Sequence, residues 1–247
     1  MKTLVSWSSG KDSAWMVHVL KRTPGVELGA LLTTVNEAVD RVAMHAVRVE
    51  LLEAQAASLG LPLRTIRIPS PCPNDVYARI MGAAVAEAVR DGFTHAAFGD
   101  LFLEDIRAYR ERQLAGSGLE PLFPLFGADT RQLGRSMIAA GLKARLTCVD
   151  PRALDPRFVG REYDAALLDE LPASVDPCGE RGEFHSFAYD GPMFRASIPV
   201  VAGEVVERGG FHFCDLLPAG PLTSGAADHG QREAEGRAAA GPSRTER

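Results

Sequence analysis

The chain has few cysteines, and no two of them stand at metal-binding spacing. They are far apart in the sequence, at Cys72, Cys148, Cys178 and Cys214. We therefore expect neither a zinc site nor a redox pair built from neighbouring cysteines. Scattered cysteines in a chain of this size are typical of reduced, packed thiols in a cytoplasmic protein.

Long apolar segments are also missing. No apolar run reaches the roughly 20 residues needed to cross a bilayer. The N-terminus, Met1-Lys2-Thr3, passes straight into a strand-like segment and lacks the pattern of a signal peptide. We therefore expect a soluble, cytoplasmic protein without a membrane partner.

The sequence has no excess of positive charge. Its 247 residues include 27 basic and 32 acidic side chains, which give a net charge of −5. Because nucleic acid-binding faces are basic, a nucleic acid partner is not expected. The hydrophobic fraction of 46% is ordinary for a globular protein, and the length suffices for one sizeable domain with a smaller appendage.

Strand and helix patterns alternate over the first 150 residues. The expected strands are Leu4–Trp7, Val26–Val35, Leu61–Ile68, Thr94–Phe98, Phe123–Phe126 and Lys143–Val149. The expected helices are Ser13–Arg22, Asp40–Leu59, Asp75–Arg90, Glu104–Leu114 and Thr130–Ala140. Asp75 is the expected N-cap of the third helix and Asp129 that of the fifth. This alternation predicts an α/β fold with a doubly wound parallel sheet, a Rossmann-like nucleotide-binding domain over residues 1–150.

The pattern changes beyond residue 150. A helix over Arg161–Leu171 and strand-like segments over His185–Phe194 and Glu204–Leu217 predict a small α+β substrate region over residues 151–218. We expect this region to be an addition to a nucleotide fold that is already complete. From residue 219 to 247 small, polar and charged residues dominate, which favours a disordered tail.

One segment has the composition of a phosphate-binding loop. The residues Ser8-Ser9-Gly10-Lys11-Asp12-Ser13 join the first predicted strand to the first predicted helix. A helix N-terminus presents unpaired N–H groups to an anion, and glycine lets the backbone approach it closely. Lysine supplies positive charge, and aspartate suits a bound Mg²⁺ ion. We therefore expect this loop to hold the phosphates of a nucleotide.

This loop is not a Walker A sequence, because Val5 stands where that motif needs glycine and Asp12 where it needs serine or threonine. It resembles the PP-loop of ATP pyrophosphatases, Ser-Gly-Gly-Lys-Asp-Ser, with Ser9 in place of the first glycine. The resemblance implies that Ser8 to Ser13 bind ATP, that Lys11 and Asp12 act in catalysis, and that Asp12 binds Mg²⁺. As an exposed loop residue, Lys11 should be replaceable by alanine with loss of ATP binding and an intact fold.

Two further pairs of residues end predicted strands. Open parallel sheets bind ligands beyond the carboxyl ends of their strands. Thr33 and Thr34 lie near the end of the second strand, and Gly99 and Asp100 follow the fourth. We expect all four to contact ATP and Asp100 to be a second Mg²⁺ ligand, although Asp100 also suits a turn or a helix cap.

The rest of the chain resembles the diphthine–ammonia ligase family, part of the adenine nucleotide alpha hydrolase-like superfamily. The last matching segment, Asp176–Phe184 followed by Asp190-Gly191-Pro192, is similar to that family's Gly-Glu-x-Gly-Glu-aromatic motif. The other matching segments lie within residues 1–195 and are Val42–Arg48, Leu59–Leu63, Gly99-Asp100, Tyr109–Arg112, Pro121–Gly127 and Phe158–Arg161.

This resemblance implies an AMP-forming ligation. ATP activates a carboxylate as an acyl-adenylate with release of pyrophosphate, and ammonia then forms the amide. The implied acceptor is diphthine on a translation elongation factor, and a small carboxylate remains an alternative. Two other interpretations are a PP-loop enzyme that modifies a tRNA base and a non-catalytic adenine-nucleotide sensor. A homodimer is a further hypothesis.

Glu180 and Glu183 are the candidate residues on the acceptor side. Neighbouring glycines allow a tight backbone path that projects both carboxylates into a cleft, where they would hold ammonium or act as a general base. The alternative is a pair of turn carboxylates that cap nearby N–H groups or pair with Arg181. By resemblance, Tyr109, Arg110 and Arg112 are candidate substrate-binding residues, the alternative being a solvated helix face.

Overall fold

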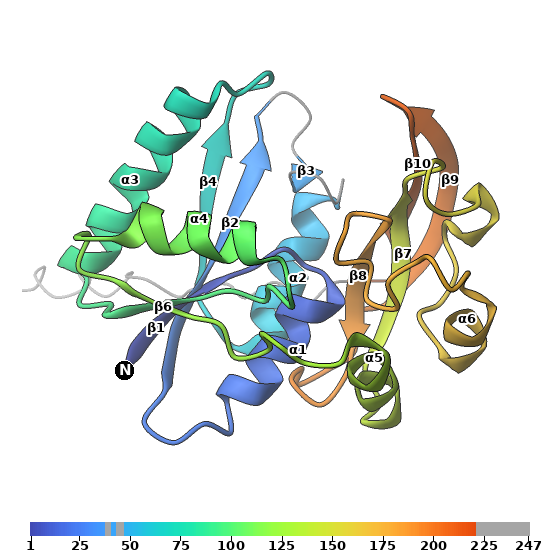
Figure 1. Ribbon diagram of the computed structural model, residues 1–247, viewed down its shortest axis with the longest axis horizontal. Coiled ribbons are helices and arrows are strands. Elements are labelled where there is room, and N and C mark those ends of the chain that lie inside the picture. The colour runs from blue at the N-terminus through green and yellow to red at the C-terminus, as the bar shows by residue number, and fades with distance from the viewer. Residues whose placement is uncertain (38–40, 43–46, 221–247) are drawn as a thin grey trace, which may run out of the picture.

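The structure is a computed structural model that describes residues 1–37, 41–42 and 47–220 (Figure 1). It contains two sheets with helices packed around them. The predicted tail over residues 219–247 lies almost wholly outside the described residues.

The first sheet is mainly parallel. Strand β1 (Lys2–Ser6) lies at its centre and pairs with β2 (Glu27–Asn36) on one side and β5 (His95–Ala97) on the other. Beyond these, β4 (Leu63–Ile68) pairs with β2, and β6 (Glu120–Leu122) pairs with β5. All four pairings are parallel, so the carboxyl ends of the five strands lie at one edge.

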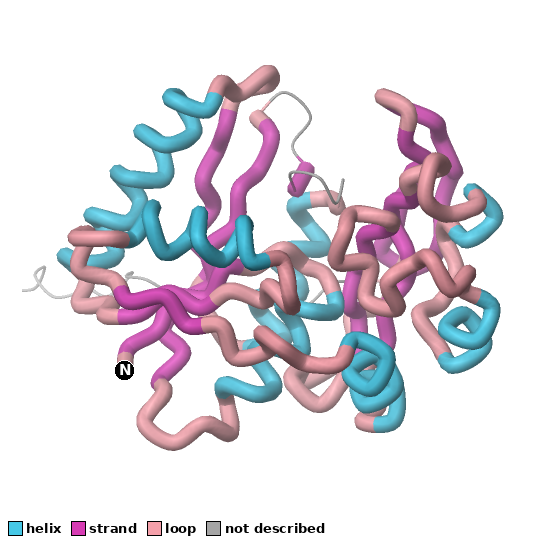
Figure 2. The backbone as a smooth tube through the Cα atoms, viewed as in Figure 1, coloured by secondary structure: helices cyan, strands magenta, loops and turns pink. Residues whose placement is uncertain are grey.

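Helices cover both faces of this sheet, as Figures 1 and 2 show. One face carries α1 (Lys11–Leu20) and α2 (Val49–Leu59), whereas α3 (Asn74–Arg90) and α4 (Glu104–Leu114) lie on the other. Successive residues of a strand point to opposite faces, so Val5 joins the first core and Leu4 the second. The predicted doubly wound α/β fold is confirmed.

The second sheet is antiparallel, with the order β8 (Phe184–Asp190), β7 (Lys143–Val149), β10 (Phe211–Pro218), β9 (Val200–Arg208). The helices α5 (Thr130–Ala139) and α6 (Ala165–Glu170) pack on each other beside it, and a 3₁₀ turn, η1, spans Pro156–Phe158. Helix α1 contacts both β1 and β8, so it lies between the two sheets (Figure 1).

The structure corrects the placement of one strand. Lys143–Val149 has the predicted bounds, but it belongs to the second sheet, where its neighbours β8 and β10 run antiparallel to it. Its strand pattern alone did not reveal its partners, because a run buried on two faces, as Leu146–Val149 is, suits either sheet. The division of the chain at residue 150 stays a prediction.

Two predicted segments are wrong near the carboxyl edge of the first sheet. Of the predicted helix Asp40–Leu59, residues 40 and 43–46 lie outside the described residues. Arg41–Val42 form a short strand, β3, that pairs with the end of β2, and the helix α2 begins at Val49. Phe123–Phe126 is a turn closed by Phe126 N–H donating to the carbonyl of Phe123, since the proline within it cannot donate to a sheet.

Two predicted segments in the C-terminal region are also shorter or divided. The helix predicted over Arg161–Leu171 begins at Ala165, because the residues before it hydrogen-bond to β7. Glu204–Leu217 is not one strand: it spans parts of β9 and β10, joined by a turn in which Gly209 and Gly210 both have positive φ.

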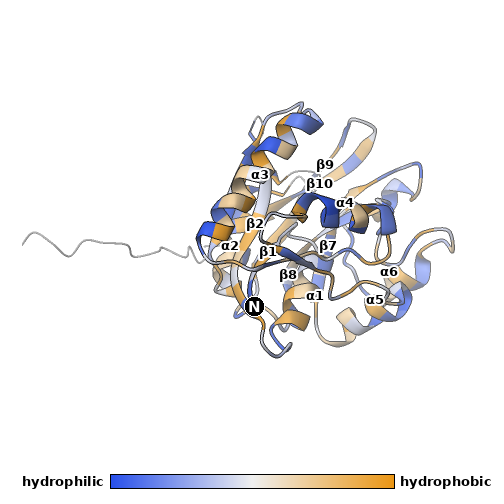
Figure 3. Cartoon of the chain, turned by 60° about the vertical axis from the view of Figure 1, so that its left-hand side comes forward, coloured by the Kyte–Doolittle hydropathy of each residue, from blue (hydrophilic) through white to orange (hydrophobic). Residues whose placement is uncertain are grey.

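Capping was predicted correctly in one of two helices. Asp129 accepts a hydrogen bond from the Gln132 amide at 2.8 Å and caps α5. Asp75 instead lies in the first turn of α3, whose N-cap is Pro73. Helix α4 has the predicted bounds, although it is mostly hydrophilic (Figure 3) and buries only Leu114.

Candidate functional site

The predicted phosphate loop joins β1 to α1. Within it Ser9 has φ of +66°, in the left-handed region that favours glycine, and its hydroxyl donates to the Ser8 carbonyl. This conformation costs a non-glycine residue about 1–2 kcal/mol. The strain is tolerated because the Ser9 carbonyl is held from two sides, by the Ala188 amide at 2.9 Å and by Gln55 at 3.0 Å.

Gln55 of α2 fixes this loop through one buried side-chain amide. It is fully buried, accepts a hydrogen bond from the Trp7 indole at 3.0 Å, and donates to the carbonyls of Ser9 and Ala188. The end of β1, the loop and β8 therefore share one anchor. Sequence analysis missed Gln55; the available signal was a polar residue on the apolar face of a helix.

The start of α1 leaves hydrogen-bond donors for an anion. The Lys11 amide donates to the Ser186 hydroxyl of β8 at 3.2 Å, whereas no other described residue accepts a hydrogen bond from the amide of Asp12 or of Ser13. A Cβ atom added to Gly99 would lie 3.4 Å from the Ser13 nitrogen. A glycine there keeps these donors uncovered, which fits a phosphate at the helix N-terminus.

The two threonines of β2 lie at the same edge of the sheet. The buried Thr33 donates its hydroxyl hydrogen bond to the Trp7 carbonyl at 2.8 Å, which links β2 to the start of the phosphate loop. Thr34 is half-buried beside it. Contact of either residue with ATP stays a prediction.

Lys11 is not the exposed residue that the sequence predicted. Its side chain is only 2% exposed and donates to Asp12 Oδ2 at 2.9 Å and to the Cys178 carbonyl. The rings of Tyr163 and Phe184 flank the ammonium, each centroid 5.3 Å away. Burial by itself lowers the pKa of Lys11, but the charges around it, Asp12 first, outweigh that effect and raise the pKa. The side chain is therefore a buried cation.

Residues 176–184, here called the acidic loop, close around this lysine. Glu183 is 5% exposed, and its two oxygens accept hydrogen bonds from the amides of Asp176 and Arg181, both at 2.9 Å. The expectation that Glu183 projects into a cleft is therefore wrong, because the loop folds around its carboxylate. Of the two interpretations, capping of nearby N–H groups describes Glu183. Asp176 adds bonds to the Cys178 amide and to the Thr130 hydroxyl.

Glu180 points the other way, toward the first sheet. Its carboxylate accepts a hydrogen bond from the Leu101 amide at 2.7 Å, just beyond β5. Burial raises the pKa of Glu180 to about 7; the Leu101 amide lowers it, and the charges of Asp12 and Asp100 raise it further. Glu180 therefore lies close to both predicted Mg²⁺ ligands and can exchange a proton near neutral pH.

Asp12 and Asp100 fit a partial Mg²⁺ site. Asp12 Oδ1 is buried and lacks a hydrogen-bond partner within the described part of the chain. The described residues hold no cluster of three or more side chains suited to a metal. Magnesium in nucleotide sites commonly takes one or two carboxylates and completes its shell with phosphate oxygens and water. The two aspartates meet that requirement when ATP supplies the remaining ligands.

Of the three candidates on α4, the structure brings only Arg110 to the site. Its Nε donates to Asp100 Oδ2 at 3.3 Å, and its guanidinium stacks 4.7 Å from the Phe98 ring. Tyr109 and Arg112 are exposed. Their role in substrate binding stays a prediction.

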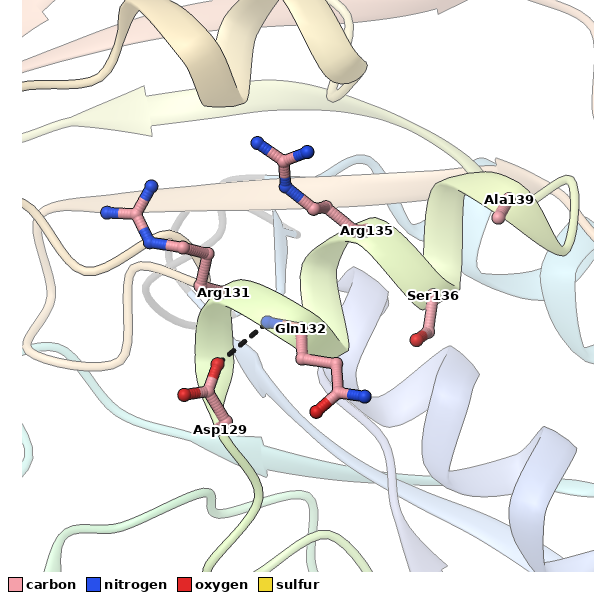
Figure 4. A pocket seen from close by; sticks show the side chains of 6 residues that line it. All are labelled: Asp129, Arg131, Gln132, Arg135, Ser136 and Ala139. Carbon is pink, nitrogen blue, oxygen red and sulfur yellow. Dashed lines mark hydrogen bonds between the residues drawn. The ribbon is translucent and has the colours of Figure 1, made fainter.

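A surface hollow of about 470 Å³ lies elsewhere, along α5 (Figure 4). Arg131, Gln132 and Arg135 line it, and none of the predicted site residues does. Arg135 pairs with Asp169 at 3.1 Å on the surface. We therefore place the candidate site at the phosphate loop and not in this hollow.

Comparison with known families accounts for nearly all described residues. Residues 1–119 match the family described as "Diphthamide synthase N-terminal domain", and residues 129–216 match "Diphthamide synthase C-terminal domain". The chain belongs to the diphthamide synthase family. The phosphate loop falls in the first match and the acidic loop in the second, so the family's two domains meet at Lys11.

Curated relatives carry a corresponding name. The proteins named "Diphthine--ammonia ligase" from Homo sapiens and Danio rerio are 27% and 29% identical, over 83% and 81% of this chain and 85% and 86% of their own lengths. The protein of that name from Schizosaccharomyces pombe is 32% identical over 40% of this chain and 17% of its own. Among the described helices none is both long and apolar enough to span a membrane.

Proposed function

We propose that this protein is an ATP-dependent, AMP-forming ligase that amidates diphthine with ammonia. The observation that carries the proposal is the contact of Lys11, in the predicted phosphate loop, with the acidic loop that also contains Glu180. The names of its relatives support diphthine as the acceptor. A small carboxylate remains the alternative acceptor.

In the first step, the acceptor carboxylate attacks the α-phosphorus of ATP and pyrophosphate leaves. The free amides of Asp12 and Ser13 bind phosphate oxygens, and Lys11 adds positive charge where negative charge develops. Asp12 and Asp100 would hold Mg²⁺, which neutralises the phosphates when bound. Arg110, which donates to Asp100 in the absence of metal, would then be available to bind the substrate.

In the second step, the nitrogen of ammonia attacks the acyl carbon, and the bond from that carbon to the AMP oxygen breaks. The products are the amide, AMP and one proton. Glu180 is the group best placed to accept that proton, because burial holds its pKa near neutrality.

The test is conversion of a purified elongation factor that carries diphthine. With ATP, Mg²⁺ and ammonium chloride, mass spectrometry should show the carboxylate become an amide only when all three are present. Asp12→Asn should abolish the change. Pyrophosphate release with small carboxylates but not with the elongation factor would assign the other acceptor. Pyrophosphate release that needs tRNA would instead indicate base modification, and ATP binding without any turnover a nucleotide sensor.

A further inference from the structure

The ammonium of Lys11 lies in an enclosure, here called the cage, formed by the Cys178 carbonyl, the Asp12 carboxylate and the rings of Tyr163 and Phe184. Nζ is 2.9 Å from Asp12 Oδ2 and 5.3 Å from each ring centroid, and it donates to the carbonyl. Oxygen acceptors combined with aromatic faces are the groups that bind small cations. The cage is thus chemically a site for an ammonium group.

Three of the four groups that form the cage, the Cys178 carbonyl and the two rings, belong to residues held by contacts that do not involve the lysine. The Tyr163 hydroxyl donates to the Pro177 carbonyl at 2.9 Å, and the Cys178 amide donates to Asp176 Oδ1 at 2.9 Å. Phe184 begins β8 and is fixed by its strand pairing and by the neighbouring Tyr163 ring, 6.3 Å away. The Cys178 carbonyl and both rings therefore keep their places when the lysine side chain leaves.

Bound ATP attracts the Lys11 ammonium out of the cage. The lysine is the first residue of α1, beside the open amides of Asp12 and Ser13 where the phosphates bind. Its side chain has four rotatable bonds, so the ammonium can swing from the cage to a phosphate oxygen. The polyphosphate carries several negative charges, whereas the cage offers one carboxylate.

We propose that the cage is the binding site of the ammonium co-substrate, which Lys11 occupies until ATP draws it out. This rests on the proposed function, which requires ammonium. The ion has the charge and the N–H donors of the lysine terminus and is smaller, so it fits the vacated space. It then loses one proton to water, its nitrogen bonds to the acyl carbon as the bond to the AMP oxygen breaks, and Glu180 accepts the second proton that leaves the nitrogen.

Ammonium kinetics test the use of the cage. Tyr163→Leu and Phe184→Leu each remove one aromatic wall and should raise KM for ammonium at least about tenfold, with KM for ATP within about threefold. Tyr163→Phe keeps the ring, so its KM for ammonium and its KM for ATP should both stay within about threefold of the wild-type values. Phe93→Leu is the matched control, because the Phe93 ring is buried and also faces a lysine ammonium, that of Lys2 at 4.8 Å, on the other face of the first sheet. An unchanged KM for ammonium in both leucine variants would overturn the proposal.

A second experiment tests ammonium binding in the cage without catalytic turnover. Lys11→Ala empties the cage, so ammonium chloride should raise its melting temperature by at least about 2 °C over sodium chloride at equal concentration. Tetramethylammonium, which is too large, and the double variant Lys11→Ala/Tyr163→Leu should show no gain. Lys11→Ser serves if the alanine variant does not fold. If ammonium does not raise the melting temperature of Lys11→Ala, the cage itself is overturned. If it does, but the wild-type protein fails to amidate the elongation factor, only the proposed function is overturned.

Discussion

The side-chain ammonium of Lys11 donates to the backbone carbonyl of Cys178, 167 residues further along the chain. One contact thus joins the phosphate loop to the acidic loop. The Lys11 amide also donates to the Ser186 hydroxyl, and the Ala188 amide donates to the Ser9 carbonyl, so β8 forms a wall of the candidate site. The C-terminal region therefore forms part of the candidate site.

Lys11→Ala should lower both ATP affinity and stability. The buried ammonium donates to both groups, so its loss leaves the Cys178 carbonyl and Asp12 without their partner. We expect ATP affinity to fall at least about tenfold, or about 1.4 kcal/mol, and the urea midpoint to fall as well. Calorimetry with a non-hydrolysable ATP analogue and urea unfolding measure the two effects. An unchanged midpoint would mean that the lysine is exposed, as the sequence alone suggests.

Glu183→Gln should destabilise the fold while turnover per folded molecule is retained. The glutamine NH₂ group cannot accept the hydrogen bond that Glu183 takes from the Asp176 or the Arg181 amide, and a buried donor left unpaired costs about 1–3 kcal/mol. Urea unfolding gives the stability, and kcat is normalised to the folded fraction. A loss of kcat by a factor of about 100 in fully folded protein would restore Glu183 as a general base.

Glu180 should make the stability of the ligand-free protein depend on pH. Its pKa in the folded protein is raised from 4.5 to about 7, so the folded state binds this proton more tightly than the unfolded chain. The stabilisation is fully present below pH 4.5 and is lost as the pH rises through about 7.

The control is Glu180→Gln, which cannot titrate. Relative to this variant, the wild type should lose stability between pH 4.5 and about 7 and run parallel to it above that range. Urea unfolding without ATP or Mg²⁺ measures both curves. Parallel curves over the whole range would show that the pKa of Glu180 is not raised by folding.

Asp100→Asn should raise the Mg²⁺ concentration needed for half-maximal pyrophosphate release by about tenfold or more, because one of the two carboxylates that face the phosphates is lost. Glu104→Gln on the exposed start of α4 is the matched control. Titration with Mg²⁺ at saturating ATP measures the shift. The same Mg²⁺ dependence in both variants would remove Asp100 from the metal site.

The sequence was sufficient for the parallel α/β core and for the position of the predicted phosphate loop between β1 and α1, because strand and helix periodicity and the loop's residues are local signals. It did not reveal that Lys143–Val149 leaves that sheet, since strand partners depend on distant residues. The burial of Lys11 was missed for the same reason. Its surroundings, Tyr163, Cys178 and Phe184, lie more than 150 residues away in the chain.

The acidic loop shows a further limit of prediction from the sequence. Glycines and glutamates alternate in it, and this pattern suits carboxylates that face outward and carboxylates that close the loop equally well. Only the hydrogen bonds separate the two, with Glu183 turned inward to the Asp176 amide and Glu180 turned outward to the Leu101 amide.

Isotope transfer from the acceptor tests the central claim most directly, that the site adenylates a carboxylate. An elongation factor whose diphthine carboxylate carries ¹⁸O is incubated with ATP, Mg²⁺ and ammonium, and the products are analysed by mass spectrometry. Attack of the carboxylate on the α-phosphorus predicts one ¹⁸O atom in AMP, none in pyrophosphate, and one AMP for each amide formed. Formation of ADP, or of AMP without the label, would contradict the account.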